Sequence, residues 1–167
     1  MGMNDSYMEH MVSKKFTAKD HFCRVSMIVL VVFFFSTSLM YSFSLIIAAI
    51  LAAVAYFVVF PRTDLEYEYT YCDKQITVDK ILAKKSRKTA GVYDVDKIEI
   101  LAPENSYRLD QYQSRSLKEV PLWSLKREDG HVPYVMIYEG NQKVILDLPQ
   151  EFVKMVQNVA PRKVYFD

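Results

Sequence analysis

The feature that most constrains the fold is a run of 36 residues, from Val25 to Phe60, that contains no Asp, Glu, Lys, Arg or His. A single helix of that length would be about 54 Å long, whereas the hydrocarbon core of a bilayer is about 30 Å thick and needs about 20 residues. The middle of the run is its most polar part, because residues 36–44 include five Ser or Thr side chains. We therefore predict a transmembrane hairpin of two helices, His21–Leu39 and Ser42–Phe60.

The residues that flank this run predict where the helices begin and end. Asp20 is a suitable N-cap for the first helix, because its carboxylate can accept hydrogen bonds from unpaired backbone N–H groups. Pro61 is expected to end the second helix, because proline has no N–H to donate. The alternative is a cleaved signal peptide, since Ala48–Ala55 contains the small-x-small spacing of a cleavage site. A signal peptide has an apolar core of only about 7–15 residues, so the longer run favours the hairpin.

Cations before the first helix predict the orientation of the hairpin. Lys14, Lys15, Lys19 and Arg24 precede it, and loops rich in Lys and Arg stay on the cytoplasmic side. A hairpin returns the chain to the side from which it started. We expect a multi-pass protein of the plasma membrane with both termini in the cytoplasm.

Small residues crowd the second helix and predict close helix packing in the membrane. Ala48 and Ala52 are four residues apart, as are Ala49 and Ala53, so each pair shares a helix face. Small side chains allow two helix backbones to approach closely in lipid. The alternative is that alanine is simply common in membrane spans.

The N-terminal segment, residues 1–20, has a weak amphipathic pattern. Met8, Met11, Val12 and Phe16 recur at helical spacing, which is compatible with a short helix lying at the membrane interface. A disordered terminus fits the same residues. Both interpretations stay open at this point.

Residues 61–167 are predicted to form a separate cytoplasmic domain that is rich in strands. They contain 17 Lys and Arg against 17 Asp and Glu, and this balance argues against nucleic-acid binding. The segment Leu65–Tyr71 alternates apolar residues with Glu66, Glu68 and Thr70, which predicts a half-buried strand with an acidic outer face. Similar patterns predict strands at about residues 65–71, 76–82, 87–93, 97–101, 120–127, 134–138 and 143–148.

The end of the chain predicts one helix after the strands. Pro149 can open it, and Phe152, Met155, Val156 and Val159 form one apolar stripe. Turn signals, such as Asp129-Gly130, favour an antiparallel meander. We therefore expect an α+β domain of six or seven antiparallel strands, in a partly open barrel or sandwich, closed by one C-terminal helix. This order of elements is similar to that of pleckstrin-homology-like (PH-like) domains.

Four short segments carry a more specific resemblance: residues 64–71 (DLEYEYTY), 98–103 (IEILAP), 107–110 (YRLD) and 158–164 (NVAPRKV). Together they resemble a family of small membrane proteins from Gram-positive bacteria that is defined by a domain of unknown function. The resemblance covers nearly the whole chain and implies two N-terminal spans followed by a PH-like domain. It transfers no functional residues.

The chain has no motif that predicts catalysis, a metal or a cofactor. Cys23 and Cys72 are 49 residues apart, and we expect two unpaired thiols. The three histidines lack the spacing of a zinc site, and four glycines leave no phosphate-binding loop. Carboxylates two residues apart, such as Asp94 and Asp96, fit a solvated strand face better than acid–base chemistry. We expect no catalytic, cofactor or metal site.

Two groups of residues are candidates for contact with a partner. The cations Lys84, Lys85, Arg87 and Lys88 flank a predicted hairpin turn and suit anionic lipid headgroups, although a solvated turn would carry the same charges. The polar loop Pro103–Lys118 contains Tyr107, Arg108, Asp110 and Arg115, and long loops often carry function. Arg108 and Asp110 can equally pair with each other and order the loop.

The function that these features favour is that of a non-enzymatic, membrane-tethered scaffold or sensor. Its PH-like domain would contact inner-leaflet lipid, a protein partner or a second copy of the chain. The alternative is an accessory subunit of a transporter or envelope enzyme that associates through its transmembrane helices. A small hydrolase is the weakest of the three interpretations.

Overall fold

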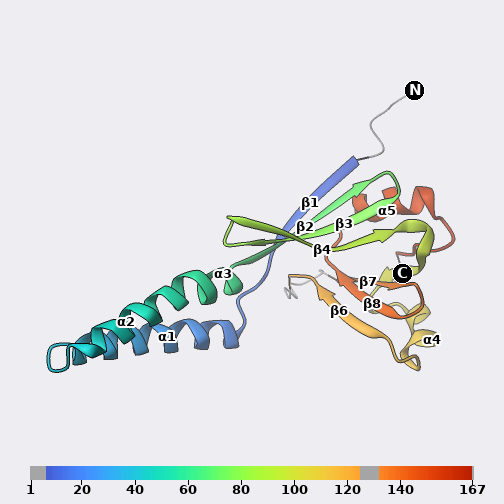
Figure 1. Ribbon diagram of the computed structural model, residues 1–167. Helices are drawn as coiled ribbons and strands as arrows, with labels where there is room; N and C mark the ends of the chain where they lie inside the picture. The colour runs from blue at the N-terminus through green and yellow to red at the C-terminus, as the bar shows by residue number, and fades with distance from the viewer. Residues whose placement is uncertain (1–6, 125–131, 167) are drawn as a thin grey trace. The chain divides into compact units, whose positions relative to one another are not determined.

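The computed structural model describes residues 7–124 and 132–166 (Figure 1). The chain divides into two compact units. The helical unit comprises Lys15–Leu65 and Leu82–Ser86, and the β unit comprises Met1–Lys14, Glu66–Ile81 and Arg87–Asp167. The chain therefore passes between the two units four times.

The first helix, α1 (Ala18–Thr37), begins three residues earlier than the sequence predicts. Thr17 is its N-cap, and Asp20 is the third helical residue of a capping box. The N–H of Thr17 donates to Asp20 Oδ2 (2.9 Å), and the N–H of Asp20 donates to Thr17 Oγ1 (3.4 Å). The prediction of Asp20 as N-cap is wrong, because the carboxylate bonds backward from inside the first turn.

The second helix runs without a break through α2 (Phe43–Val54), a π-helical turn η1 (Ala55–Val59) and α3 (Phe60–Thr63). Pro61 does not end it, contrary to the prediction. In the π turn the N–H of Phe60 donates to the carbonyl oxygen of Ala55, five residues back, so one extra residue is accommodated just before the proline. The helix then continues to Thr63.

The two helices pack side by side as a hairpin (Figure 1). Ser44, Ala48 and Ala55 are buried on the second helix, whereas no residue of α1 is fully buried. Ala49, Ala52 and Ala53 are exposed, so of the four predicted packing alanines only Ala48 lies in the contact between the helices. Both helices are long and apolar enough to cross a bilayer.

The first sheet of the β unit has the strand order β1-β2-β3-β4. Its strands are β1 (Tyr7–Ser13), β2 (Leu65–Cys72), β3 (Gln75–Leu82) and β4 (Ser86–Asp94). β1 pairs antiparallel with β2, from Tyr7 opposite Cys72 to Ser13 opposite Glu66. The predicted interfacial helix and the disordered terminus are therefore both wrong for residues 7–13. Exposed and half-buried residues alternate along β1, which is the period of an edge strand.

The second sheet has the order β5-β7-β8-β6, formed by β5 (Ile98–Pro103), β6 (Lys118–Leu122), β7 (Tyr134–Tyr138) and β8 (Gln142–Leu146). β6 runs parallel to β8, so the predicted all-antiparallel meander is wrong. The physical reason is the segment after β5, which crosses the sheet and packs Leu109, Tyr112 and Leu117 onto its apolar face. The part of the predicted strand 120–127 beyond residue 124, and the predicted turn at Asp129-Gly130, lie outside the described residues.

The helix α5 (Gln150–Val159) follows the second sheet, as predicted. Phe152 and Val156 of its apolar stripe are buried, and the Phe152 ring meets Tyr71 of β2 edge to face at 6.1 Å. Short 3-10 turns, η2 (Val95–Lys97) and η3 (Tyr107–Leu109), and the one-turn helix α4 (Asp110–Gln113) complete the described elements. Two sheets with a terminal helix agree with a PH-like fold, and the partly open barrel stays a prediction.

Polar groups join the two sheets inside the core of the β unit. The Tyr69 hydroxyl of β2 donates to the carbonyl oxygen of Leu122 on β6 (2.6 Å) and accepts from the N–H of Asp147 (3.2 Å). The buried Asp147 carboxylate accepts from the N–H of Ser124 (2.6 Å). Burial raises the pKa of Tyr69, which keeps this hydroxyl a neutral donor.

Candidate functional site

The strongest candidate site is the turn between β3 and β4, which we call the β3–β4 turn (Leu82–Lys85). Ala83 and Lys84 both have positive φ angles, 49° and 56°, and the N–H of Lys85 donates to the carbonyl oxygen of Leu82 (3.1 Å). This is the geometry of a two-residue type I′ hairpin turn. Lys84 and Lys85 are exposed on a short and well-defined loop.

The β3–β4 turn is bonded to the second helix, and both belong to the helical unit. The N–H of Ala83 donates to the carbonyl oxygen of Asp64, just after the helix ends (2.8 Å). The Lys85 ammonium lies 3.3 Å from the Tyr56 hydroxyl and 5.5 Å from the centre of that ring. Two contacts thus hold the turn against the end of the helix that leads into β2.

Arg24 joins the same end of the two helices. Its Nε donates to Thr63 Oγ1 (2.6 Å), and its guanidinium lies over the rings of Phe16 (4.4 Å) and Phe60 (5.6 Å). An arginine can place its apolar stem along such rings while its charge stays near water. Arg24 therefore closes the open end of the hairpin.

Charge is distributed unevenly between the two units. The helical unit contains six of the 21 cations of the chain but only two of its 20 acids. All eight lie at the same end of the two helices or on the β3–β4 turn, because residues 25–60 are uncharged. This end of the hairpin is therefore strongly cationic, whereas the rest of the chain is weakly acidic.

Arg87, one of the four predicted lipid-binding cations, pairs with carboxylates of the first sheet. It forms an ion pair with Glu68 of β2, and its Nε lies 3.7 Å from Asp79 Oδ2 of β3. Glu68 is 2% exposed, so the predicted acidic outer face is wrong at this position. Arg87 crosses from β4 to neutralise a buried carboxylate, which explains why Glu68 can be buried. Lys88 is exposed on β4.

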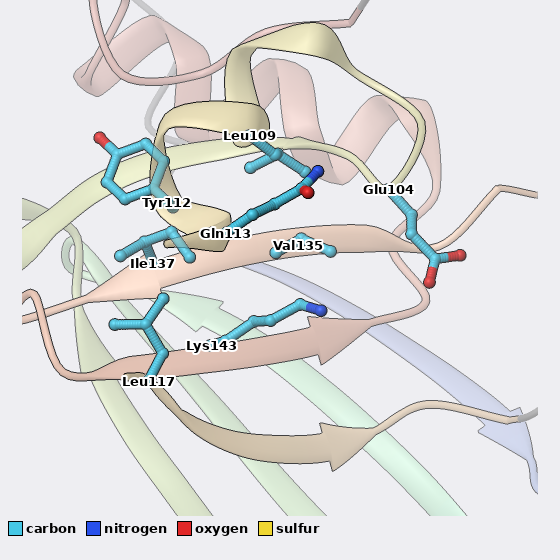
Figure 2. Close-up of a pocket in the computed structure, with 8 residues that line it drawn as sticks. All are labelled: Glu104, Leu109, Tyr112, Gln113, Leu117, Val135, Ile137 and Lys143. Atoms are coloured by element: carbon cyan, nitrogen blue, oxygen red, sulfur yellow. The ribbon is translucent and has the colours of Figure 1, made fainter. Parts of the chain in front are cut away.

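A second candidate site lies under the segment that crosses the second sheet. A hollow of about 160 Å³ separates this segment from β7 and β8 (Figure 2). Its lining combines apolar side chains with the charged groups of Glu104 and Lys143; the apolar and uncharged residues are Leu109, Tyr112, Gln113, Leu117, Val135 and Ile137. Burial raises the pKa of Tyr112, which favours a neutral hydroxyl there.

The four loop residues that the sequence offered as candidates for partner contact do not line that hollow. Tyr107, Arg108 and Asp110 line a second, more open hollow of about 420 Å³. The Arg108 guanidinium lies 4.1 Å from the centre of the Tyr165 ring, and the Asp110 carboxylate accepts from Gln113 Nε2 (2.9 Å).

Arg115 lies apart from the other three loop residues. It pairs with Glu99 (3.1 Å) and covers the Tyr112 ring. The loop is therefore ordered by ring contacts and ion pairs that sequence reasoning did not identify.

Sequence reasoning also missed Tyr56 as a candidate, although its position in the chain carried a signal. It is a tyrosine near the end of a predicted span, where aromatic residues are enriched at membrane interfaces.

Both cysteines, Cys23 and Cys72, are free and exposed. Across residues 7–124 and 132–166, no three His, Cys, Asp or Glu side chains are grouped as a metal site would need.

Comparison with known proteins places the chain in a family. The model of the family described as "Bacterial PH-like domain (DUF6106)" matches residues 4–166. The chain belongs to this family. The match includes β1, both apolar helices and the β unit, so it confirms the resemblance drawn from the four short segments. No curated protein and no solved structure matches the chain.

Proposed function

We propose that this bacterial PH-like protein is a non-enzymatic scaffold or sensor that is anchored in the plasma membrane by its helical hairpin. Its PH-like domain is held permanently at the inner leaflet, where the β3–β4 turn contacts acidic lipid headgroups. A tether raises the effective concentration of a weak binding surface, so even a modest contact with lipid is populated.

The observation that carries this proposal is the pairing of β1 with β2. The helices α1 and α2 lie between these two strands in the sequence, and the strands are neighbours in one sheet. A sheet cannot form across a bilayer, so the chain must cross the membrane an even number of times between β1 and β2. Two apolar helices of 20 and 21 residues meet this requirement.

The exposed surface of the helices supports a membrane location. Large apolar side chains are exposed along both helices, such as Val29, Phe33, Ile46 and Phe57. Soluble monomers rarely expose continuous apolar patches of this kind, whereas lipid covers them at no cost. The cations at the open end of the hairpin favour a cytoplasmic location for that end, and with it for both termini.

The buried carboxylates support a non-enzymatic role. Glu68 is neutralised by Arg87, and Asp147 accepts a hydrogen bond from the backbone N–H of Ser124. A carboxylate that acts as a general acid or base must reach a substrate, and these two are already bonded to the chain itself. Both groups have structural partners that account for their burial.

Cysteine labelling tests the topology. In the variant Cys23→Ser the exposed Cys72 is the remaining thiol, and it reports on the β2–β3 turn. We expect a membrane-impermeant maleimide to leave Cys72 unlabelled in intact cells and to label it after lysis. A matched variant that lacks both native cysteines and carries Ser38→Cys between the helices should be labelled in intact cells. Labelling of Cys72 from outside would contradict the proposal.

The second candidate function, an accessory subunit of a larger membrane complex, is favoured by the exposed alanines. Ala49, Ala52 and Ala53 are small, and they lie outside the contact within the hairpin. Small residues that are free of the hairpin suit a helix of another protein. Under this alternative, Ala52→Leu should abolish co-purification with a larger complex and leave the hairpin intact. Ala48→Leu should disturb the hairpin itself, because Ala48 is buried.

A further inference from the structure

The β3–β4 turn reaches a part of the second helix that lies inside the predicted membrane span. This helix, Phe43–Thr63, has 21 residues and is about 31 Å long, so it just covers the hydrocarbon core. Tyr56 lies seven residues before its end, which corresponds to about 10 Å along the helix axis. The hydroxyl of Tyr56 is nevertheless within 3.3 Å of the Lys85 ammonium.

A lysine at this level needs an anionic partner. Placing an ammonium below the surface of the headgroup region is costly unless the charge is paired or stays in the interface. Lys85 donates to a neutral phenol, which does not neutralise it. Lys84 adds a second cation on the same turn. The nearest anions that a bilayer supplies are the phosphates of its lipids, which lie in the headgroup region, and a long lysine side chain can extend toward them.

We infer that the β3–β4 turn and Tyr56 form a binding site for the phosphate of an anionic phospholipid of the inner leaflet. The ammonium groups of Lys84 and Lys85 bind the phosphate oxygens, and the Tyr56 hydroxyl donates to the same group. A phenol oxygen that accepts a hydrogen bond from Lys85 can still donate its own proton. This inference rests on the proposed function, because it requires the second helix to cross the membrane.

The apolar surroundings favour a lipid over a free phosphate. Phe57 is 73% exposed beside Tyr56, and the two rings meet at 4.9 Å. An acyl chain below the phosphate would cover Phe57, whereas inorganic phosphate would leave it exposed. The site therefore offers cations for the headgroup and an aromatic surface for the chain below it.

The backbone of the turn fixes the position of the two lysines. A type I′ turn has two residues only, and the bond from Ala83 N–H to the Asp64 carbonyl holds it on the helix. Little conformational freedom is then lost when a phosphate binds, which strengthens the interaction.

The test uses the full chain in detergent micelles, with native mass spectrometry to measure the binding of added phosphatidylglycerol. We expect Lys85→Gln to weaken this binding roughly tenfold, since a charge-assisted hydrogen bond is lost. Tyr56→Phe should weaken it about threefold, as expected for a neutral hydrogen bond. The double variant should bind little more weakly than Lys85→Gln alone, because both groups act on one phosphate.

Lys74→Gln is the control for charge, because Lys74 lies in the β2–β3 turn, where it occupies the position that Lys84 has in the β3–β4 turn, with a φ of 65°. We expect it to bind phosphatidylglycerol as the wild type does. Equal losses in Lys74→Gln and Lys85→Gln would overturn the inference, since they would show a general effect of charge. Thermal melts of each variant check that the fold is kept.

Two further arms identify the source of the phosphate. Phosphatidylcholine should bind much more weakly than phosphatidylglycerol, and glycerol phosphate should not displace the lipid at equal concentration. Displacement by glycerol phosphate would overturn the inference in favour of a free anion. Failure of the cysteine-labelling test would remove the proposed function, whereas unchanged lipid binding in Lys85→Gln with intact topology would remove this inference and leave the membrane anchor of the proposed function in place.

Discussion

Two turns of the first sheet have the same backbone geometry and different surroundings. Asp73 and Lys74 join β2 to β3 with φ angles of 46° and 65°, and Ala83 and Lys84 join β3 to β4 with 49° and 56°. The carbonyl of Lys74 accepts from the N–H of Val95 within the β unit (2.9 Å). The N–H of Ala83 instead donates to Asp64 of the helical unit.

The residues of the two turns differ in how well they suit this geometry. Asp tolerates a positive φ because its short polar side chain can bond locally, whereas Ala has no such compensation. The β3–β4 turn therefore combines a strained residue with two adjacent lysines. Strain that the surrounding structure maintains is typical of functional positions. The two turns therefore differ in what holds them: the β2–β3 turn bonds within the β unit, whereas the β3–β4 turn, the proposed binding site, bonds to the chain at the end of the second helix.

The largest expected effect on stability is that of replacing Arg87, which lies two positions after the β3–β4 turn. Arg87→Gln should lower the free energy of unfolding by about 2 kcal/mol, because the buried Glu68 carboxylate loses its cation. Thermal unfolding of the full chain in detergent, followed by near-UV circular dichroism, measures this change. Lipid binding at the turn should stay close to that of the wild type once the protein is folded.

Glu68→Gln provides the matched variant for this ion pair. The double variant Arg87→Gln with Glu68→Gln should be more stable than the single variant Arg87→Gln, because no charge is left buried. If Arg87→Gln changed lipid binding and left the melting temperature unaltered, Arg87 would belong to the binding surface and its assignment to the fold would be wrong.

Replacing the first central residue of each turn should change the free energy of unfolding by about 1 kcal/mol, with opposite signs for the two turns. Asp73→Ala should destabilise the protein, because alanine would be forced to a positive φ, and Ala83→Asn should stabilise it. Chemical unfolding of the two variants in the same detergent measures both shifts. Equal shifts of the same sign would show that the two turns do not differ in backbone strain.

A charged version of this exchange separates stability from binding. Ala83→Asp should also relieve the strain, yet it places a carboxylate beside Lys84 and Lys85. We expect it to bind phosphatidylglycerol more weakly than Ala83→Asn in the mass-spectrometric assay, although both variants fold. Equal binding by the two variants would mean that charge at this turn does not matter.

The smallest expected effect is that of the exposed lysines on stability. Lys74→Gln and Lys84→Gln should each change the free energy of unfolding by less than about 0.5 kcal/mol, as is usual for surface positions. The two variants should differ only in lipid binding. A melt of Lys84→Gln that fell well below that of Lys74→Gln would assign Lys84 to the fold.

Local sequence patterns predicted much of this architecture. The uncharged run fixed the two helices, because few charged side chains are tolerated in a span, and the alternation in Leu65–Tyr71 predicted β2. The stripe through Phe152 and Val156 predicted α5. Each of these patterns places apolar residues at the regular spacing of a single helix or strand. Each could therefore be recognised without knowing which element packs against it.

Features that depend on distant partners could not be predicted in this way. Residues 7–13 fit both a helical and a strand period, and only pairing with β2, more than 50 residues later, selects the strand. Arg87 and Lys85 are both cations of one short segment, yet Arg87 forms an ion pair with Glu68 and Lys85 forms a hydrogen bond with Tyr56. Their roles are decided by the strand order and by the contact of the turn with the helix.

The decisive test of the hairpin topology is a cross-link between β1 and β2 in native membranes. Ser13 and Glu66 are opposite each other in the register, and their side chains are hydrogen bonded (3.2 Å). In a chain without native cysteines, Ser13→Cys and Glu66→Cys should form an intramolecular disulfide on mild oxidation, because paired strands bring the two Cα atoms within reach. The pair Tyr7→Cys and Glu66→Cys should not. If Ser13→Cys and Glu66→Cys stayed unlinked and reacted with a maleimide from opposite sides of the membrane, the pairing of β1 with β2 on one side of the membrane would be wrong.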